Sequence, residues 1–263
     1  MNFIKKFHEK VLEHDIDWDV KGLITVNNQI ISLGSDSKLI GRIFELISNP
    51  LMREIAEENG FKLEIPDSQT TYPDFTLSKY KKDGSVKERI AVDIKTTYKK
   101  YNAKKEPSKI GFTLGSYGSF IRNNTKNILF PYNTYDSHYV VGFLYDRVDD
   151  AKEGDIYDEN DDVIVPYTNV EYFVQEKHKI AGEKPGSGNT ENIGSIASNN
   201  IDDYVEGNGI FSLLGEEIFN DYWRNYPKNR AQNKEFTNIK EYIEWKRNNG
   251  YDVSELEKLL NND

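Results

Sequence analysis

The chain has 263 residues, with 44 acidic and 34 basic side chains, and its formal net charge is −10. It contains no cysteine, which excludes disulfide bonds, a thiolate nucleophile and cysteine-ligated zinc. No apolar run approaches the roughly 18 residues that a membrane helix needs, and the charged N-terminal 15 residues lack the apolar stretch of a signal peptide. These properties predict a cytoplasmic globular protein with a sizeable core.

The negative charge argues against a nucleic-acid partner, because proteins that bind nucleic acids usually carry a basic surface. The charges are segregated, however, since residues 146–162 hold nine acids and two bases. Basic side chains gather elsewhere, at Lys79, Lys81, Lys82, Lys99, Lys100, Lys104, Lys105, Arg122 and Lys126. The sequence therefore permits a basic groove on an acidic protein.

Two elements are predicted near the N-terminus. Residues 2–15 have apolar side chains at Phe3, Phe7 and Val11, which is the spacing of one helix face. Residues 22–33 read as two strands around the turn dipeptide Asn27-Asn28.

A longer helix is predicted from about Lys38, with Asp36 or Ser37 as its cap. Its expected apolar stripe is Leu39, Ile43, Leu46 and Ile47. Pro50 should kink this helix or begin a second one that Gly60 ends. Glu45 lies within the helix, and the pattern alone leaves open whether it is an exposed carboxylate or a functional one.

The stretch 72–98 predicts a hairpin, because two runs rich in β-branched and aromatic residues flank a turn containing Asp83-Gly84. In the second run, Asp93 and Lys95 share a face with Ala91 and project together, roughly 7 Å apart along the strand. In the first run, Asp74 lies on the face opposite Phe75. Two carboxylates and an ammonium group can therefore meet on one side of the hairpin.

The remaining elements alternate irregularly. They are a short helix over 120–128, strands at 138–144 and 170–174, a Gly/Ser/Asn loop over 186–196, and helices at 218–226, 238–246 and 253–260. This order favours an α/β fold of the α+β type, with a mixed central β-sheet flanked by helices, over a doubly wound parallel sheet.

Two interpretations fit the acid-x-Lys triplet at Asp93. Such triplets recur in a chain this charged, so solvated charges at a sheet edge are one interpretation. The other is metal-assisted phosphodiester cleavage, in which carboxylates hold Mg²⁺ and the lysine stabilises developing negative charge. The four histidines fit no zinc spacing, and neither a serine-hydrolase elbow nor a P-loop occurs.

The loop 186–196 also has two interpretations. It is either a flexible connection, or a segment whose glycines let the backbone approach a base edge while Asn189 bonds adenine in the major groove.

Taken together, several segments resemble type II restriction endonucleases of the PD-(D/E)xK superfamily. They are LGSDSKLIGRIFEL (33–46), YPDFTL (72–77), AVDIKTTY (91–98), FTLGSYGSFIRNNTKNI (112–128), AGEKPGSGNTENIGSI (181–196) and DYWRNY (221–226). The resemblance implies the restriction-endonuclease-like fold in a single endonuclease domain over 1–263. A small dimerisation part would include 19–33, and a catalytic and DNA-binding part would cover most of 34–246.

The resemblance also implies the site. Asp74, Asp93, Lys95 and Glu45 are the expected catalytic residues, with Asp74, Asp93 and Glu45 binding Mg²⁺. The expected DNA-binding residues are Lys38, Gln69, Thr96, Thr97, Ser119, Lys126, Gly186, Ser187, Gly188, Asn189, Thr190 and Asn192. The implied protein is a homodimer that cuts double-stranded DNA, with a host methyltransferase protecting the same site without binding the enzyme.

By resemblance to one member of the family, the implied target is GATATC, cut at its centre to leave blunt ends with 5′-phosphates. The run 68–71 keeps only Gln69 of the family's minor-groove segment. Two alternatives stay open: a structure-selective nuclease of the same superfamily, and a DNA-binding module without catalysis.

Overall fold

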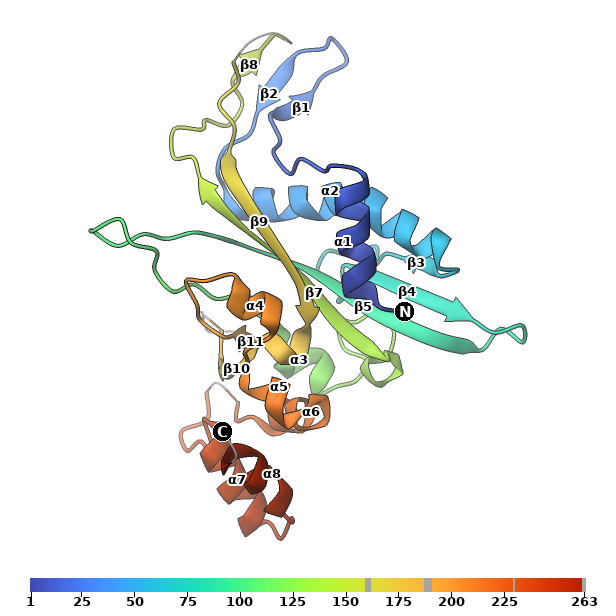
Figure 1. Cartoon of the computed structure of the whole chain (residues 1–263), viewed down its shortest axis with the longest axis vertical. Helices are drawn as coiled ribbons and strands as arrows, with labels where there is room; N and C mark the ends of the chain where they lie inside the picture. The colour runs from blue at the N-terminus through green and yellow to red at the C-terminus, as the bar shows by residue number, and fades with distance from the viewer. Residues whose placement is uncertain (159–161, 187–190, 229, 262–263) are drawn as a thin grey trace.

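A five-stranded mixed sheet forms the centre of the computed structural model, which describes residues 1–158, 162–186, 191–228 and 230–261 (Figure 1). Its strands, in spatial order, are β3 (Lys62–Glu64), β4 (Phe75–Tyr80), β5 (Val86–Tyr98), β7 (Ser137–Arg147) and β9 (Tyr167–Glu176). Only β5 and β7 pair in parallel, and the other neighbours are antiparallel. The predicted mixed sheet and the predicted hairpin are confirmed.

Both faces of this sheet are buried. Ile90, Val92 and Ile94 of β5 pack into a hydrophobic cluster with α1 (Phe3–Glu13) and α2 (Ser37–Glu58). Ala91 points the other way, into a second cluster. That cluster includes side chains from α4 (Asp202–Glu206), α5 (Ile210–Leu214), α6 (Glu216–Asn225), α7 (Ile239–Asn248) and α8 (Ser254–Asn261). Because side chains alternate along a strand, Asp93 and Lys95 lie on the face of Ala91.

Two smaller sheets extend this core. One contains β1 (Gly22–Ile24), β2 (Ile30–Ser32) and β8 (Ile156–Tyr157), so the predicted N-terminal hairpin pairs with part of the acidic stretch 146–162. The other has the order β10 (Ala181–Pro185), β11 (Asn192–Ser195), β6 (Thr113–Ser116). The predicted loop over 186–196 is therefore wrong at its C-terminal end, where pairing with β6 and β10 makes residues 192–195 a strand.

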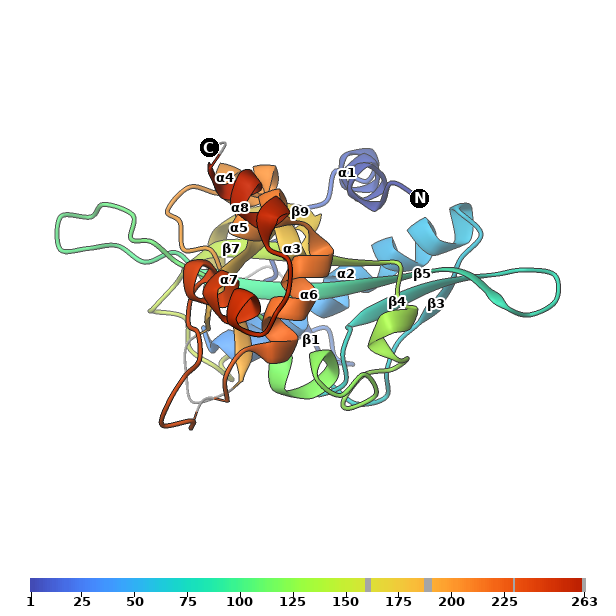
Figure 2. The ribbon, with the colours of Figure 1, turned by 90° about the horizontal axis from the view of Figure 1, so that it is seen from below.

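The shape is elongated. The sheet of β1, β2 and β8 lies at one end, and α7 and α8 lie together at the other (Figure 1). Seen from below, the β4–β5 turn and the loop after β5 project on opposite sides (Figure 2). In the part of the chain that the structure describes, no helix is both long and apolar enough to cross a membrane.

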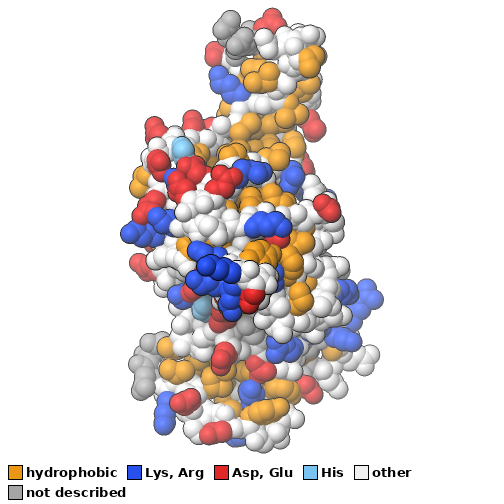
Figure 3. Space-filling model, turned by 90° about the vertical axis from the view of Figure 1, so that its right-hand side faces the viewer, with side chains coloured by type: hydrophobic (Ala, Val, Ile, Leu, Met, Phe, Trp, Pro, Cys, Tyr) orange, Lys and Arg blue, Asp and Glu red, His pale blue; other side chains and the backbone are white. Residues whose placement is uncertain are grey.

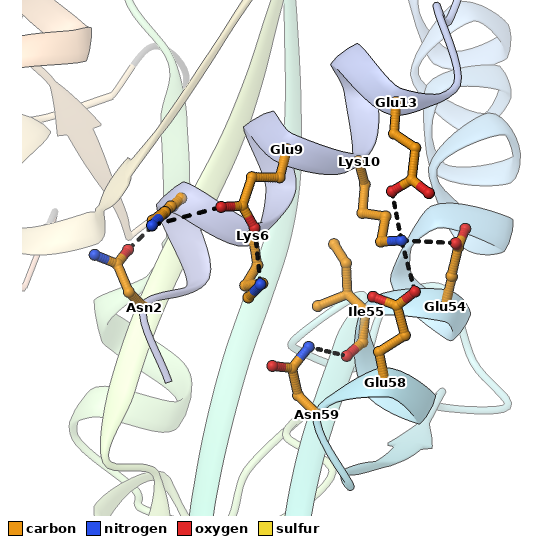
Figure 4. A network of polar contacts seen from close by, with 10 residues as sticks. Asn2, Lys6, Glu9, Lys10, Glu13, Glu54, Ile55, Glu58 and Asn59 are labelled. Carbon is orange, nitrogen blue, oxygen red and sulfur yellow. Dashed lines mark hydrogen bonds and ion pairs between the residues drawn. The ribbon is translucent and has the colours of Figure 1, made fainter.

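Helix α1 is fixed to α2 by one buried lysine. Nζ of Lys10 lies 2.7 Å from Glu13, 2.8 Å from Glu54 and 2.6 Å from Glu58 (Figure 4). These hydrogen bonds raise the pKa of Lys10, so its charge is retained despite burial. The predicted apolar face is also confirmed, since Phe3, Phe7 and Val11 are buried.

Helix α2 departs from its predicted pattern. Asp36 caps it as expected, accepting from the backbone nitrogens of Lys38 and Leu39. The buried stripe, however, is Ile40, Ile43, Phe44, Leu51, Met52 and Ile55, whereas Leu46 is 54% exposed. Pro50 lies inside one continuous helix instead of starting a second. Three buried side chains after it, each stabilising by about 1.5–3 kcal/mol, outweigh a cost of about 3 kcal/mol for an interior proline.

The predicted helix over 120–128 is displaced toward the N-terminus. The structure has a single π-helical turn, η1 (Tyr117–Ile121), and a 3-10 turn, η2 (Tyr132–Thr134). Asn127 adopts a positive φ of 55°, which a continuing helix does not allow. The one-turn helix α3 (Lys177–Ile180), between β9 and β10, was not predicted.

Candidate active site and DNA-binding surface

Strand β5 carries two of the four charged residues of the predicted site, Asp93 and Lys95, and it is a central strand. Asp93 lies opposite Val140 of β7, and the neighbouring Val92 pairs with Phe75 of β4. Asp93 is buried, with 3% of its surface exposed. The interpretation of these charges as solvated groups at a sheet edge is therefore wrong.

Asp74 joins this pair from the segment just before β4. Its Oδ2 accepts a hydrogen bond of 2.6 Å from the backbone nitrogen of Ile94, between Asp93 and Lys95. Nζ of Lys95 lies 2.7 Å from Oδ2 of Asp93. The hairpin therefore brings Asp74, Asp93 and Lys95 together, as the alternation pattern predicts.

These three side chains face a polar cavity of about 250 Å³. Its other lining residues come from the segment before β4, from β6, η1 and their surroundings, and from β11: Gln69, Thr70, Thr71, Tyr72, Gly115, Ser116, Ser119, Phe120, Asn127 and Asn192. Segments more than 100 residues apart in sequence thus form one site.

In the cavity, the two carboxyl groups of Asp74 and Asp93 lie close to each other, and the positive charge of Lys95 offsets their repulsion only in part. Burial, and then the neighbouring Asp93, raise the pKa of Asp74 to about 8. Burial opposes the charge of Lys95, but Asp93 and Asp74 outweigh it, and the pKa of Lys95 is raised above its ordinary value. Lys95 is therefore an ammonium group at neutral pH.

The residues present fit a hard divalent cation. Oδ2 of Asp93 is buried and receives no hydrogen bond of good geometry from any described residue, although Lys95 is close. Oxygen atoms of aspartate are preferred ligands of Mg²⁺, and a cation between Asp74 and Asp93 would relieve their mutual repulsion.

Glu45 lies beside this cavity. It lines an adjacent pocket of about 90 Å³ together with Asp74 and Gln69, and its carboxylate is paired with Arg42. Among the described residues, no three histidine, aspartate or glutamate side chains converge as a ready metal site. The structure thus places Glu45 near Asp74 without joining it to the Asp74–Asp93 pair.

The expected DNA-binding residues divide into groups. Gln69, Ser119 and Asn192 line the cavity that Asp74, Asp93 and Lys95 face, while Thr97 and Gly186 line a neighbouring groove of about 930 Å³. Three lysines, Lys100, Lys109 and Lys184, also line that groove.

The other expected DNA-binding residues line neither the cavity nor the groove, or lie outside the described residues. Thr96 faces Gly41 of α2, and Lys38 and Lys126 are exposed side chains that line neither. Ser187, Gly188, Asn189 and Thr190 lie outside the described residues.

Sequence reasoning missed a buried polar cluster behind the cavity. Nζ of Lys177 donates to the hydroxyl of Tyr72 over 2.8 Å, and that hydroxyl lies 2.9 Å from Nδ1 of His138. Burial lowers the pKa of Lys177 to about 7 and also lowers the pKa of His138. The sequence pattern that could have predicted this cluster is weak, because its three residues are separated by more than 100 positions along the chain.

A mixed sheet that presents Pro-Asp, just before one strand, and Asp-x-Lys, on the adjacent strand, to one cavity defines the class of PD-(D/E)xK nucleases. A family model described as restriction endonuclease EcoRV matches residues 14–247. The type II restriction enzyme EcoRV of Escherichia coli is 46% identical over 232 residues, which are 87% of this chain and 91% of that protein. The chain belongs to the EcoRV family of type II restriction endonucleases. Helix α8 follows the matched region.

One prediction concerns stability without metal. The raised pKa of Asp74 means that the folded state holds a proton that the unfolded state releases near pH 4, so stability falls as pH rises from about 4 to 8. We expect Asp74→Asn to raise Tm by about 2–4 °C at pH 8.5 in EDTA, corresponding to about 1 kcal/mol, and by less at pH 5.

Differential scanning calorimetry measures this effect. Mg²⁺ should raise Tm of the wild type more than that of the variant. An Asp74→Asn protein that is less stable than the wild type at pH 8.5 in EDTA would contradict the electrostatic account of the cavity.

Proposed function

We propose that this chain is a Mg²⁺-dependent, homodimeric endonuclease that cuts duplex DNA at the centre of GATATC, leaving blunt ends with 5′-phosphates. The observation that carries the proposal is the convergence of Asp74, Asp93 and Lys95 on one cavity beside a groove lined by lysines. The similarity to EcoRV supports the choice of target.

Asp74, Asp93 and Lys95 of the cavity, and Glu45 beside it, have roles in the proposed reaction. Asp74 and Asp93 would hold the cation, and Glu45 would contribute from the adjacent pocket. Mg²⁺ bound there supplies charge neutralisation at the scissile phosphate and a lowered pKa of bound water. Lys95, which is positively charged, stabilises the negative charge that develops on the phosphate and helps to orient the attacking water.

Recognition is assigned to the groove and its edge. Gly186–Thr190 would read the outer base pairs in the major groove, with support from Asn192. Gly186 lines the groove, and its backbone nitrogen donates to the carbonyl of Asn192 over 2.9 Å. Lys100, Lys109 and Lys184 would bind phosphates, and the flexible central TA step would be read through its deformation.

Dimerisation is assigned to the sheet of β1, β2 and β8. This projecting end exposes Leu23, Ile24, Val26 and Ile156, and Val26 is fully exposed. Hydrophobic side chains appear on this upper end in the space-filling view (Figure 3). A contiguous exposed apolar surface is typical of an interface, and a two-fold dimer matches the two halves of a palindrome.

The double substitution Ile24→Asp with Val26→Asp should convert the dimer into a monomer, because it places charges in an apolar contact. Sedimentation velocity measures the change. Leu12→Asp is the control, since Leu12 is 80% exposed on α1, which is not part of this sheet, and should leave the dimer intact. A wild-type protein that sediments as a monomer would contradict the assignment.

The function is tested with short DNA duplexes in Mg²⁺. A duplex containing GATATC should be cut once, and duplexes with one base pair changed should resist. Cleavage of a four-way junction with linear duplexes left intact would favour the structure-selective alternative. Binding without any Mg²⁺-dependent cleavage would favour the non-catalytic module.

A further inference from the structure

One ion pair joins Glu191, the residue after the proposed recognition segment Gly186–Thr190, to the wall of the catalytic cavity. Nη1 of Arg122, which follows η1, lies 3.2 Å from Oε2 of Glu191, the residue just before β11. Their side chains are 20% and 29% exposed, respectively, so solvent screens the pair less than it would a surface pair.

The backbone of Glu191 is held against the same wall. Its carbonyl accepts from the backbone nitrogen of Gly118 over 3.2 Å and from Oγ of Ser116 over 3.1 Å. A Cβ atom at position 118 would clash with the Glu191 side chain. Glycine at this position is therefore what permits the close approach of Glu191 to η1.

Arg122 is also held by contacts with the C-terminal end of α6 and with Tyr117. Its Nε donates to the carbonyl of Arg224 over 3.3 Å, its Nη2 donates to the carbonyl of Tyr226, and its guanidinium lies 5.0 Å from the ring centroid of Tyr117. These carbonyls lie at the C-terminal end of α6, where a positive charge is favourable. A planar guanidinium with donors directed to several acceptors is a rigid anchor.

Both partners of the ion pair adjoin residues of the catalytic cavity. Ser119 and Phe120, just before Arg122, line the cavity with Asp93 and Lys95. Asn192, next to Glu191, also lines it. Through the hydrogen bond between Gly186 and Asn192, β11 also closes the base of the segment assigned to base reading.

We propose that Arg122 and Glu191 are positioning residues that lock β11 to η1, so that correct reading of the target is required for efficient cleavage. The inference rests on the proposed function, because it concerns the same cavity and the same recognition segment. Removing the pair should reduce cleavage of the correct target more than cleavage of an incorrect one, since only the correct complex uses the locked arrangement.

The test measures single-turnover cleavage of a GATATC duplex and of a duplex with one outer base pair changed. Glu191→Gln keeps the side-chain shape and removes its charge. We expect the rate on GATATC to fall about tenfold, in line with the loss of a charge-assisted hydrogen bond, and the rate on the altered site to fall less than about twofold. The ratio between the two rates should therefore fall at least about fivefold.

Two further variants separate this role from a general structural one. Arg122→Lys keeps the charge without the planar fork and should also lower the ratio. The double variant Arg122→Lys with Glu191→Gln should match Arg122→Lys alone within about twofold, because the two residues act as one unit. Glu257→Gln removes a carboxylate from the remote pair with Arg247 and should leave the ratio unchanged.

The outcomes are distinguishable. An unchanged ratio in folded Glu191→Gln and Arg122→Lys proteins, or an equal loss at both sites, would overturn the inference while leaving the proposed function in place. A wild-type protein that does not cut the GATATC duplex would overturn the proposed function and the inference with it.

Discussion

Replacing Asp93 with alanine is expected to lower the rate of DNA cleavage by about 1000-fold or more while DNA binding persists. Asp93 supplies a buried oxygen that no hydrogen bond of good geometry satisfies, and this oxygen faces Lys95 and the cavity. Without it, the cavity loses one of two carboxylates that would hold the cation. The residues that line the lysine-bearing groove are unchanged, so DNA affinity should be retained.

The measurement combines single-turnover cleavage with a DNA-binding titration of the same variant in Mg²⁺. Asp83→Ala is the matched control, because it removes an aspartate from the exposed turn at the other end of the same hairpin. Its cleavage rate should stay within about twofold of the wild type, as for most surface substitutions. An Asp93→Ala protein that cuts at the wild-type rate would disprove the site assignment.

Lys95→Ala should reduce cleavage by about 100- to 1000-fold, the usual effect of removing one group that stabilises transition-state charge. It should also destabilise the metal-free protein. The ammonium group of Lys95 offsets the repulsion between Asp74 and Asp93, and alanine removes that positive charge. This change in Tm has the sign opposite to that expected for Asp74→Asn. Its size should increase as pH rises toward the raised pKa of Asp74, because the Asp74 carboxyl group then ionises.

Lys95→Arg is the control for charge. It retains the positive charge, so its thermal stability should be closer to that of the wild type than Lys95→Ala is. Its cleavage should still fall, because a guanidinium does not occupy the position of an ammonium group. If Lys95→Ala cleaved DNA at the same rate as the wild type, Lys95 would have no role in catalysis.

Local patterns predicted the core of the site, because its geometry is local. The alternation over 72–98 and the Asp83-Gly84 turn fix which side chains share a face, and β4 and β5 form the expected hairpin. The parallel partner β7 begins about 40 residues after Asp93, so the burial of Asp93 by a central position in the sheet could not be read from the hairpin.

Where the sequence patterns predicted the structure wrongly, as for the buried face of α2 and for residues 192–195, tertiary packing determines the observed structure. In α2, several apolar stripes fit a helical spacing, and the contact with Phe143 of β7 selected the one containing Phe44. Residues 192–195 looked like loop because of their small and polar side chains. Pairing with β6 supplies the backbone partners that make them a strand.

The resemblance to restriction endonucleases supplied what neither pattern nor geometry gives alone. It identified the family, which the similarity to EcoRV confirms, and it singled out the expected DNA contacts. The cluster of Tyr72, His138 and Lys177 was beyond both approaches. Its members come from the segment before β4, from β7 and from α3, and only the folded chain brings them together.

Sequencing all the DNA ends that the protein produces from a long natural DNA in Mg²⁺ tests the central claim most directly. We predict that every end lies at the centre of a GATATC site, is blunt and carries a 5′-phosphate, and that EDTA prevents cleavage. Ends scattered without relation to GATATC, or ends produced equally in EDTA, would contradict the claim that this chain is a metal-dependent endonuclease specific for that sequence.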